Sequence, residues 1–279
     1  MIEIGINPVA FLNIRWYGIF ISLAIVSIIL YLGWQVRKGA RLSFDTVFTG
    51  SLVGVISGVA ISRLLHVIDN IVIAKLHPEL VLTGAVIDYT QYPGQIIGGA
   101  GLTAYGAVLG AALGVWVYSR FSKMQFGYAA DLTAPAVIMA QAVIGRIGCT
   151  INGCCYGIPT TLPWGLVYKD EGSLAYLASQ RLPEGMGLHP TQVYEIIFGL
   201  IVFGVLLKLR GRFKPDGSLF LIYLGLYSLW RIGIDFLRVG NPFLFGLHQA
   251  QVIGIIVLAI VIPVLALRTR WVKVEEESE

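Results

Sequence analysis

Long apolar runs constrain this chain more than any other feature of its sequence. About seven runs reach the roughly 17 to 25 residues that a helix needs to cross a bilayer. They lie near Trp16 to Val36, Thr46 to Ile68, Ile96 to Ser119, Ala129 to Gly148, Thr191 to Leu209, Ser218 to Leu237 and Gln249 to Leu267. Helices are required because lipid cannot hydrogen-bond a bare backbone, and continuous runs do not fit the alternating strands of a barrel. We therefore predict an all-α polytopic membrane protein that forms one domain over residues 1–279.

The composition excludes an ordinary soluble domain. Of the 279 residues, 56% are hydrophobic and only 13% are charged, whereas charged residues make up about 25% of a typical soluble domain. The lysines and arginines fall in short clusters between the apolar runs, and no basic face interleaved with aromatic residues is present. Nucleic acid is therefore not an expected partner.

The basic residues between the runs predict an orientation. Most follow the first, third, fifth and seventh runs: Arg37, Lys38, Arg41, Arg120, Lys123, Lys208, Arg210, Arg212, Lys214, Arg268, Arg270 and Lys273. Fewer lie on the other side: Arg15, Lys75, Lys169, Arg181 and Arg238. Because Lys and Arg concentrate in cytoplasmic loops, we expect the N-terminus outside and the C-terminus in the cytoplasm.

Three arginines lie inside apolar runs. Arg63, Arg146 and Arg231 fall in the second, fourth and sixth runs, each towards the expected outer end. A guanidinium stays charged in a protein, and near hydrocarbon it costs several kcal/mol unless it meets an anion, carbonyl groups or water. We expect the three to converge near the outer leaflet, where a lipid phosphate is a ready partner. The alternative is a buried ion pair, for example of Arg231 with Asp235 four residues later.

Other polar residues in the runs leave two interpretations open. Glu195 and Asp131 either belong to a site or act as counter-ions of an arginine, and His66 is either a site residue or a hydrogen-bonded residue of helix packing. Tyr17, Tyr105 and Tyr227 suit the interfacial belt where membrane tyrosines gather. The glycines of the third run, Gly98, Gly99, Gly101, Gly106 and Gly110, favour close helix packing over a ligand role.

Two long connections are expected outside, from Asp69 to Gln95 and from Cys149 to Pro190. We predict that residues 149–190 fold as a small extracytoplasmic cap, because long structured loops usually carry function. This segment holds all three cysteines, Cys149, Cys154 and Cys155. Their odd number and the absence of paired histidines do not match a zinc pattern, so we assign no metal ligand or nucleophile among them. A disulfide from Cys149 to one of the other two stays open.

Several ordered motifs resemble one family. They are GRIGCTINGCCYGIPTTLPWGLVY at residues 145–168, IRWYGIF at 14–20, IIGGAGLTAYGAVLGA at 96–111, HPTQVYE at 189–195 and YSLWRIGIDFLR at 227–238. The chain resembles the prolipoprotein diacylglyceryl transferases, bacterial inner-membrane enzymes that place a diacylglyceryl group on the lipobox cysteine of lipoprotein precursors.

The resemblance implies a substrate, a reaction and a set of residues. Phosphatidylglycerol and the lipobox signal peptide are the implied partners, and no cofactor is implied. The substrate thiol attacks the glycerol carbon esterified to phosphate and releases glycerol phosphate. Arg146 is implied to bind the lipid headgroup and Arg231 to be the second essential arginine. Other matching or intramembrane positions complete the predicted site: Asn152, Gly157, Tyr17, Tyr227, Asp235, Arg63 and Tyr105.

The chain departs from the family pattern at several positions. Tyr105 stands where many members have histidine, and because a phenol is a poor base at neutral pH, that histidine cannot be obligatory here. Cys154 replaces a frequent glutamate and Cys149 a frequent asparagine. The interval from Pro135 to Arg146 is one residue longer than usual.

A competing interpretation is a non-catalytic lipid or anion carrier of the same fold, in which the arginines line a translocation path. Such carriers are often built from inverted repeats with broken helices at equivalent places, and the two halves of this sequence have no such symmetry. A purely structural scaffold is a third interpretation, and three arginines at similar expected depth disfavour it.

Overall fold

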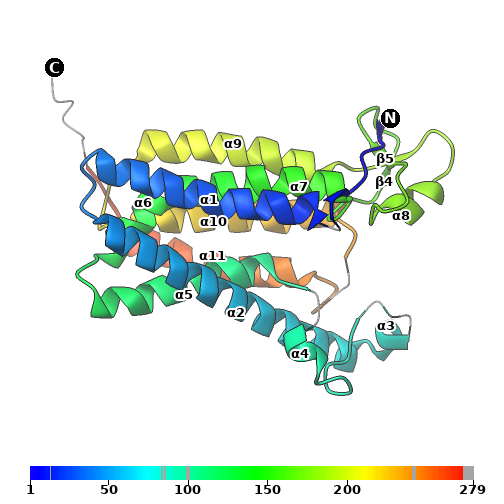
Figure 1. Ribbon diagram of the computed structural model, residues 1–279, viewed down its shortest axis with the longest axis horizontal. Coiled ribbons are helices and arrows are strands. Elements are labelled where there is room, and N and C mark those ends of the chain that lie inside the picture. The colour runs from blue at the N-terminus through cyan, green and yellow to red at the C-terminus, as the bar shows by residue number, and fades with distance from the viewer. Residues whose placement is uncertain (13, 83, 85, 99–100, 241–242, 273–279) are drawn as a thin grey trace. The chain divides into compact units, whose positions relative to one another are not determined.

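Helices make up most of the protein in its computed structural model (Figure 1). The structure describes residues 1–12, 14–82, 84, 86–98, 101–240 and 243–272. The long helices are α1 (Trp16–Arg37), α2 (Phe44–Leu76), α5 (Ala104–Phe121), α6 (Phe126–Ile138), α9 (Thr191–Leu209), α10 (Ser218–Ile234) and α11 (Gln249–Arg268). The short helical segments are α3 (Pro78–Leu82), α4 (Gln95–Gly98), the π-helix η1 (Met139–Ile144), α7 (Gly145–Asn152), α8 (Tyr176–Gln180) and the 3-10 helix η2 (Asp235–Leu237).

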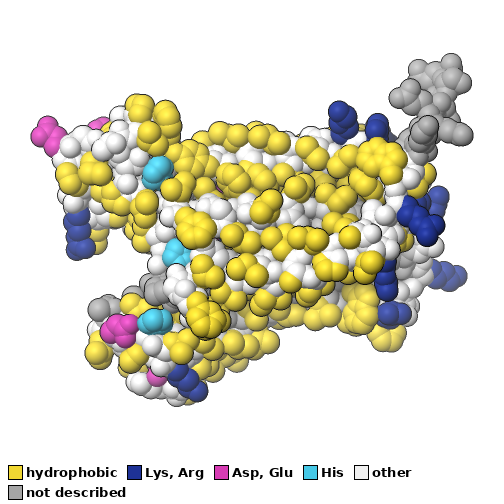
Figure 2. Space-filling model, turned by 180° about the vertical axis from the view of Figure 1, so that it is seen from behind, with side chains coloured by type: hydrophobic (Ala, Val, Ile, Leu, Met, Phe, Trp, Pro, Cys, Tyr) yellow, Lys and Arg dark blue, Asp and Glu magenta, His cyan; other side chains and the backbone are white. Residues whose placement is uncertain are grey.

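Within the described residues, six helical segments are long and apolar enough to cross a membrane. They are Trp16–Arg37, Phe44–Leu76, Phe126–Asn152, Thr191–Leu209, Ser218–Leu237 and Gln249–Arg268. Large apolar side chains are exposed along these helices, and Figure 2 shows them covering the helix flanks, as expected of a surface that faces lipid. The prediction of a helical, polytopic membrane protein is therefore confirmed.

Two predicted segments differ from the structure. The continuous run from Ile96 is wrong as a single helix, because α4 ends at Gly98 and α5 begins only at Ala104. Gly101 lies between them with φ +110°, a conformation that glycine adopts readily and that does not occur within a right-handed helix. The long connection from Asp69 is also shorter than expected, because α2 continues to Leu76. The last turns of α2 bury Ile73 and Ala74 against Val86.

The chain folds into two compact units. The first comprises the described residues of Met1–Ala40, Gly127–Asn241 and Ala250–Glu279, and the second those of Arg41–Phe126 and Pro242–Gln249. In the first unit, α1 and α9 both pack against η1 and α7, and α10 packs against α9. Glycines permit these approaches, since a Cβ on Gly148 would lie 2.9 Å from Phe20 Cβ, and one on Gly199 2.7 Å from Ala142 Cβ.

A small sheet lies at one end of the first unit. Its strand order is β1-β5-β6-β4, with bounds β1 (Ile2–Ile4), β4 (Pro159–Thr160), β5 (Leu166–Tyr168) and β6 (Gly187–Leu188). β1 pairs with β5 in parallel, and β6 pairs antiparallel with both β5 and β4. Side chains of this region form a buried cluster of Leu166, Tyr168, Ala175 and Leu188. The segment 153–190 therefore folds around a core of its own.

The other end of the first unit joins three helix ends. Arg210, which follows α9, donates to Gln35 Oε1 of α1 at 2.8 Å. β7 (Phe213–Lys214) pairs with β8 (Arg270–Trp271), which connects the ends of α9 and α11.

At the start of α1, a short hairpin of β2 (Val9–Phe11) and β3 (Ile14–Arg15) precedes the helix.

The expected fourth span contains a π-helix. Pro135 lies inside α6, and η1 follows directly and continues into α7 without interruption. A π-helix closes i to i+5 hydrogen bonds, so it accommodates one more residue than an α-helical turn, and it is frequent at functional sites. The π-helix ends two residues before Arg146, and the extra residue expected in this interval from the resemblance stays a prediction.

The second unit is built on close packing of α2 with α5. A Cβ on Gly110 would lie 2.7 Å from the Ser57 carbonyl oxygen, and one on Gly106 would lie 2.6 Å from Ser62 Cα. Ser62 Oγ also donates to the Thr103 carbonyl at 2.7 Å. The packing role predicted for Gly106 and Gly110 is confirmed, whereas Gly99 lies outside the described residues.

Candidate functional site

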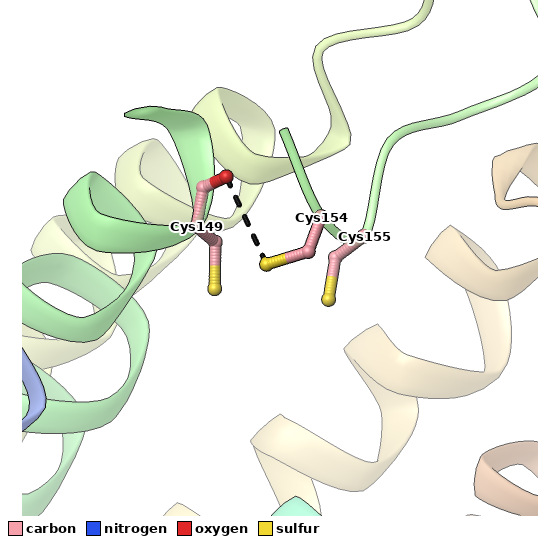
Figure 3. A group of neighbouring side chains, drawn as sticks. All are labelled: Cys149, Cys154 and Cys155. Carbon is pink, nitrogen blue, oxygen red and sulfur yellow. Dashed lines mark hydrogen bonds between the residues drawn. The ribbon is translucent and has the colours of Figure 1, made fainter. Parts of the chain in front are cut away.

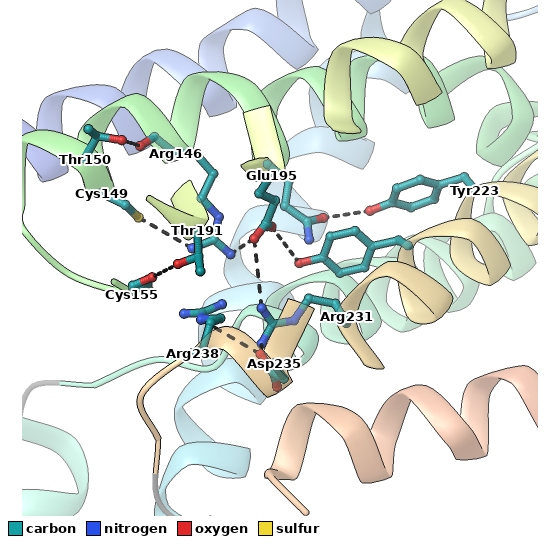
Figure 4. A network of polar contacts seen from close by, with 12 residues as sticks. Arg146, Cys149, Thr150, Cys155, Thr191, Glu195, Tyr223, Arg231, Asp235 and Arg238 are labelled. Atoms are coloured by element: carbon teal, nitrogen blue, oxygen red, sulfur yellow. Dashed lines mark hydrogen bonds and ion pairs between the residues drawn. The ribbon is translucent and has the colours of Figure 1, made fainter. Parts of the chain in front are cut away.

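Arg146 is buried near the start of α7, directly after the π-helix, with 8% of its surface exposed. Its Nη2 donates to Glu195 Oε1 at 2.9 Å, and its Nη1 lies 3.8 Å from Cys149 Sγ (Figure 4). Its buried Nε has no hydrogen-bond partner among the described residues. Part of the donor capacity of this guanidinium is therefore unused within the described protein.

Glu195 joins the two predicted site arginines. It lies in the second turn of α9 with 1% of its surface exposed. Besides Arg146, its carboxylate accepts from Tyr227 Oη at 3.3 Å, and its Oε2 lies 3.9 Å from Arg231 Nη1 of α10. Of the three arginines predicted to converge, Arg146 and Arg231 thus meet at one carboxylate, whereas Arg63 belongs to the second unit. Glu195 is a counter-ion of both, which confirms that interpretation.

Arg231 also has its own acidic neighbour. Its Nη2 lies 2.8 Å from Asp235 Oδ1, so the predicted pairing four residues along the helix is present together with the contact to Glu195. Arg238 Nε lies 3.9 Å from the same oxygen. The network thus holds the guanidinium groups of Arg146, Arg231 and Arg238 against the carboxylates of Glu195 and Asp235. One positive charge remains uncompensated within it, and an uncompensated charge is expensive in a buried setting.

Asn152 and Gly157 shape the loop that follows α7. Asn152 Oδ1 accepts from Arg15 Nη1 at 2.9 Å, and α7 then ends at Gly153 in the left-handed conformation. Gly157 N donates to the His189 carbonyl at 2.9 Å. A Cβ on Gly157 would lie 2.5 Å from both His189 Cβ and the Leu237 carbonyl oxygen, so only glycine fits there.

The start of α9 holds this loop from the other side. Thr191 Oγ1 donates to the Cys155 carbonyl at 2.6 Å, and Gln192 Nε2 donates to the Cys154 carbonyl at 2.7 Å. Both side chains are buried, with 1% of their surface exposed. Sequence reasoning assigned neither residue to the site, although the polar HPTQVYE motif at the start of an apolar run was the available signal.

The three cysteines lie together beside Arg146, and all three are free thiols. Their sulfur atoms lie within 4.8 Å of one another (Figure 3). Hydrogen bonds from the Cys149 and Cys154 thiols lower the pKa of the Cys155 thiol well below its ordinary value, although burial opposes this effect. Among the three thiols, negative charge is therefore favoured on Cys155.

Two predicted site residues belong to the second unit. Arg63 donates through Nε to the Ile96 carbonyl at 2.8 Å, through Nη1 to the Gly101 carbonyl at 3.1 Å, and through Nη2 to the Gln95 carbonyl. These carbonyl groups stabilise its charge. Tyr105 is buried near the start of α5, with 7% of its surface exposed. Their predicted roles stay predictions.

Three further candidates also have defined surroundings. The ring of His66 lies edge-on to that of Tyr89, with the ring centroids 6.1 Å apart. This contact fits the packing interpretation, and the site role stays a prediction. The interpretation of Asp131 as a counter-ion of an arginine is wrong within the described residues. Its carboxylate oxygens accept hydrogen bonds from the backbone N–H groups of Gly217 and Phe220 at the start of α10, each at 2.8 Å. Carboxylates are stabilised at such helix ends. Tyr17 lies on α1, whose backbone contacts Gly148 of α7.

The first unit therefore contains two buried guanidinium groups that retain hydrogen-bond donors without a partner among the described residues. The carboxylate of Glu195 lies between these two groups, and both arginines are on helices and not on loops. Such preorganised donors stabilise a group that gains negative charge during a reaction, because they need no reorganisation when that charge develops. Planar guanidinium donors also suit phosphate oxygens geometrically.

Comparisons with known proteins agree on one family. The model of the family described as prolipoprotein diacylglyceryl transferase matches residues 6–267. A protein of Dehalococcoides mccartyi is 39% identical over 282 residues, covering 100% of both chains. A protein of Acaryochloris marina is 34% identical over 250 residues, covering 88% of this chain and 84% of its own. One of Clostridium tetani is 32% identical over 240 residues, covering 85% and 86%. All three are named phosphatidylglycerol–prolipoprotein diacylglyceryl transferase.

Proposed function

The chain belongs to the prolipoprotein diacylglyceryl transferase family, and from this premise we propose the reaction that it catalyses. It transfers the diacylglyceryl group of phosphatidylglycerol to the lipobox cysteine thiol of a prolipoprotein and releases glycerol phosphate. The names of the relatives support both substrates. The observation that carries the proposal is the buried network in which Arg146 and Arg231, from different helices, share the carboxylate of Glu195. No observation favours the carrier.

Arg146 and Arg231 bind the headgroup phosphate in this proposal. Arg146 Nε and Arg231 Nη1 are buried and have no hydrogen-bond partner among the described residues, so both retain donor capacity for phosphate oxygens. Glu195 is a positioning residue in this proposal, because its carboxylate holds both guanidinium groups. Tyr227 supports Glu195 through its hydroxyl group.

The chemical step is a displacement at carbon. The substrate thiol first loses its proton to water. The thiolate sulfur then forms a bond to the diacylglyceryl carbon that is esterified to phosphate, and the bond from that carbon to the phosphate oxygen breaks, so glycerol phosphate leaves with the bonding pair. Negative charge moves onto the departing phosphate, so guanidinium groups fixed beside it stabilise the transition state more than the ground state. The same positive charge lowers the pKa of the incoming thiol. Phosphate binding and thiol activation therefore share one pair of arginines.

The remaining predicted residues take supporting roles. Asn152 and Gly157 shape the loop beside Arg146, and Asp235 orients Arg231 through the 2.8 Å ion pair. Tyr17 is a further substrate-binding residue in this proposal. For Arg63 and Tyr105 of the second unit, a role in the reaction stays a prediction from the resemblance, and a phenol is a poor base at neutral pH.

The topology completes the proposal. We place seven spans in a bacterial inner membrane as one transferase domain over residues 1–279. Six are the long apolar segments given above, and α5 is the seventh. The basic residues Arg37, Lys208 and Arg268 lie in the last turns of α1, α9 and α11, whose ends lie together. This end is cytoplasmic by the positive-inside rule. The extracytoplasmic cap at the other end is the segment 153–190, four residues shorter than predicted because α7 continues to Asn152.

A reconstituted assay tests the reaction. Purified protein is incubated with phosphatidylglycerol vesicles and a lipobox peptide, and we expect equimolar glycerol phosphate and diacylglyceryl peptide. The same peptide with its cysteine replaced by serine is the matched control and yields neither product. A carrier would move lipid without consuming it, so unchanged phosphatidylglycerol together with measurable lipid or anion transport would contradict the proposal.

A further inference from the structure

The three cysteines gather from two segments of the chain. Cys149 lies in the last turn of α7, and Cys154 and Cys155 lie in the loop after the left-handed Gly153. They are the 3 cysteines of the sequence, and their sulfur atoms lie within 4.8 Å of one another. Figure 3 shows the side chains meeting in one small region. The transfer reaction proposed above uses none of them.

The spacing of the sulfur atoms suits a metal ion better than a disulfide. Zinc–sulfur bonds of about 2.3 Å place the sulfurs of one ion about 4 Å apart. From the observed separations, the thiols need to approach by at most about 1 Å to reach this arrangement. A disulfide requires a sulfur separation of about 2 Å, and therefore a larger movement of the backbone.

The backbone of the loop is held in a conformation that presents the thiols. Cys155 has φ +62°, in the left-handed region that residues other than glycine rarely adopt. The hydrogen bonds from Thr191 and Gln192 to the carbonyls of Cys155 and Cys154 maintain it. Backbone strain of this kind concentrates at functional sites, because the surrounding structure must enforce it. This observation is independent of the sulfur distances.

The charge of the surroundings also fits. Three thiolates and one divalent cation leave a net charge of one negative unit, which a buried site must compensate. Arg146 Nη1 lies 3.8 Å from Cys149 Sγ and supplies the matching positive charge. Thiolate ligands select soft and borderline ions over hard ones such as magnesium or calcium.

We propose that Cys149, Cys154 and Cys155 form a three-thiolate site for a thiophilic divalent cation of the zinc class. The ion joins the end of α7 to the loop that follows it, next to Arg146. Three protein ligands leave a fourth coordination position for water, as in zinc sites that are not closed structural centres. The site shares Arg146 with the proposed transferase activity, and it is tested by metal binding alone, so its failure and that of the proposed function are distinguishable.

Metal titration of the full chain tests this site. The purified, reduced and chelator-washed protein is titrated with Zn²⁺ and with Cd²⁺, and the ultraviolet charge-transfer band of cadmium–thiolate bonds is followed. We expect one ion per chain, protection of the thiols from a maleimide reagent, and a rise in melting temperature that tracks occupancy. Each of Cys149→Ser, Cys154→Ser and Cys155→Ser weakens binding at least tenfold, and the triple variant lacks the band.

Two controls keep the test decisive. His77→Gln removes the imidazole that lies 3.1 Å from Glu79, a surface pair able to bind zinc weakly, and should leave the cysteine site unchanged. Melting curves of the metal-free variants establish that they fold. Wild-type protein with three titratable thiols that binds no cadmium overturns the proposal. So does binding of equal strength in the folded triple variant, or conversion of the reduced protein to a disulfide in place of metal binding.

Discussion

Replacing Glu195 by glutamine removes the anion that lies between Arg146 and Arg231. The carboxamide retains an oxygen that accepts from Arg146 Nη2, so the change alters charge with little change of shape. Two guanidinium groups that shared a carboxylate then face each other in a buried region. We expect the variant to insert in the membrane and to be markedly less stable.

The size of this effect follows from the distances. A pair of unit charges at about 4 Å interacts by about 4 kcal/mol at an effective dielectric constant near 20, and Arg231 Nη1 lies 3.9 Å from Glu195 Oε2. Arg146 lies closer, at 2.9 Å. Removing one partner of a buried ion pair typically costs about 3–5 kcal/mol, because the other charge stays buried. We therefore expect a loss of at least about 3 kcal/mol in the free energy of unfolding.

Anionic lipid should reverse part of this loss. If the arginines bind a phosphate, phosphatidylglycerol supplies the charge that Glu195→Gln removes. Phosphatidylglycerol nanodiscs should then stabilise the variant more than the wild type, relative to phosphatidylcholine nanodiscs. Melting temperatures in the two lipids measure this, with Glu184→Gln as the exposed matched control. A Glu195→Gln variant as stable as wild type, or one equally unstable in both lipids, would refute the reasoning.

Three further outcomes are expected. Arg146→Ala and Arg231→Ala should each reduce diacylglyceryl transfer by at least about a hundredfold. The assay is glycerol phosphate release from membranes that contain wild-type amounts of the variant. Turnover close to wild type in either variant would exclude the role of that arginine. Tyr105→Phe should cost less activity than either arginine change, and complete loss in the same assay would place the phenol in the chemistry. Gly157→Ala should lose about 1–3 kcal/mol through overpacking, since its Cβ would meet the Leu237 carbonyl oxygen at 2.5 Å. Gly233→Ala, where no atom lies within 4 Å, is the matched control for melting, and equal curves for these two variants would contradict the steric argument.

Hydropathy predicted the helical spans well because bilayer thickness fixes their length. The ends of α9 coincide with the predicted limits, and those of α1 and α11 differ by one residue. The break before α5 was missed, because the run from Ile96 is apolar throughout and hydropathy does not register backbone conformation. Gly101, with its positive φ, was the local signal of that break.

The charges of the site were predictable one residue at a time, whereas their pairing was not. A guanidinium in an apolar run identifies Arg146 and Arg231 by its cost alone. Which acid meets which arginine depends on contacts between helices, since Arg146 and Glu195 are 49 residues apart in sequence. Asp131 illustrates the same limit: a buried acid predicts a positive partner, and the start of a helix 86 residues later supplies it.

The cysteine cluster depended on a turn that the sequence pattern does not specify. Spacing alone did not match a zinc motif, because Cys154 and Cys155 are adjacent and ligands on neighbouring residues usually point apart. The left-handed conformations of Gly153 and Cys155 change the direction of the chain within three residues. Buried side chains at the start of α9 then hold that turn in place.

The central claim is that Arg146 and Arg231, from different helices, bind one lipid phosphate. A structure of the protein determined with phosphatidylglycerol bound tests it most directly. The account predicts headgroup phosphate oxygens within about 3 Å of nitrogen atoms of both guanidinium groups, with Glu195 still in contact with each arginine. A headgroup that contacts neither arginine would contradict the claim. So would a phosphate bound by other residues while Arg146 and Arg231 contact only Glu195 and Asp235.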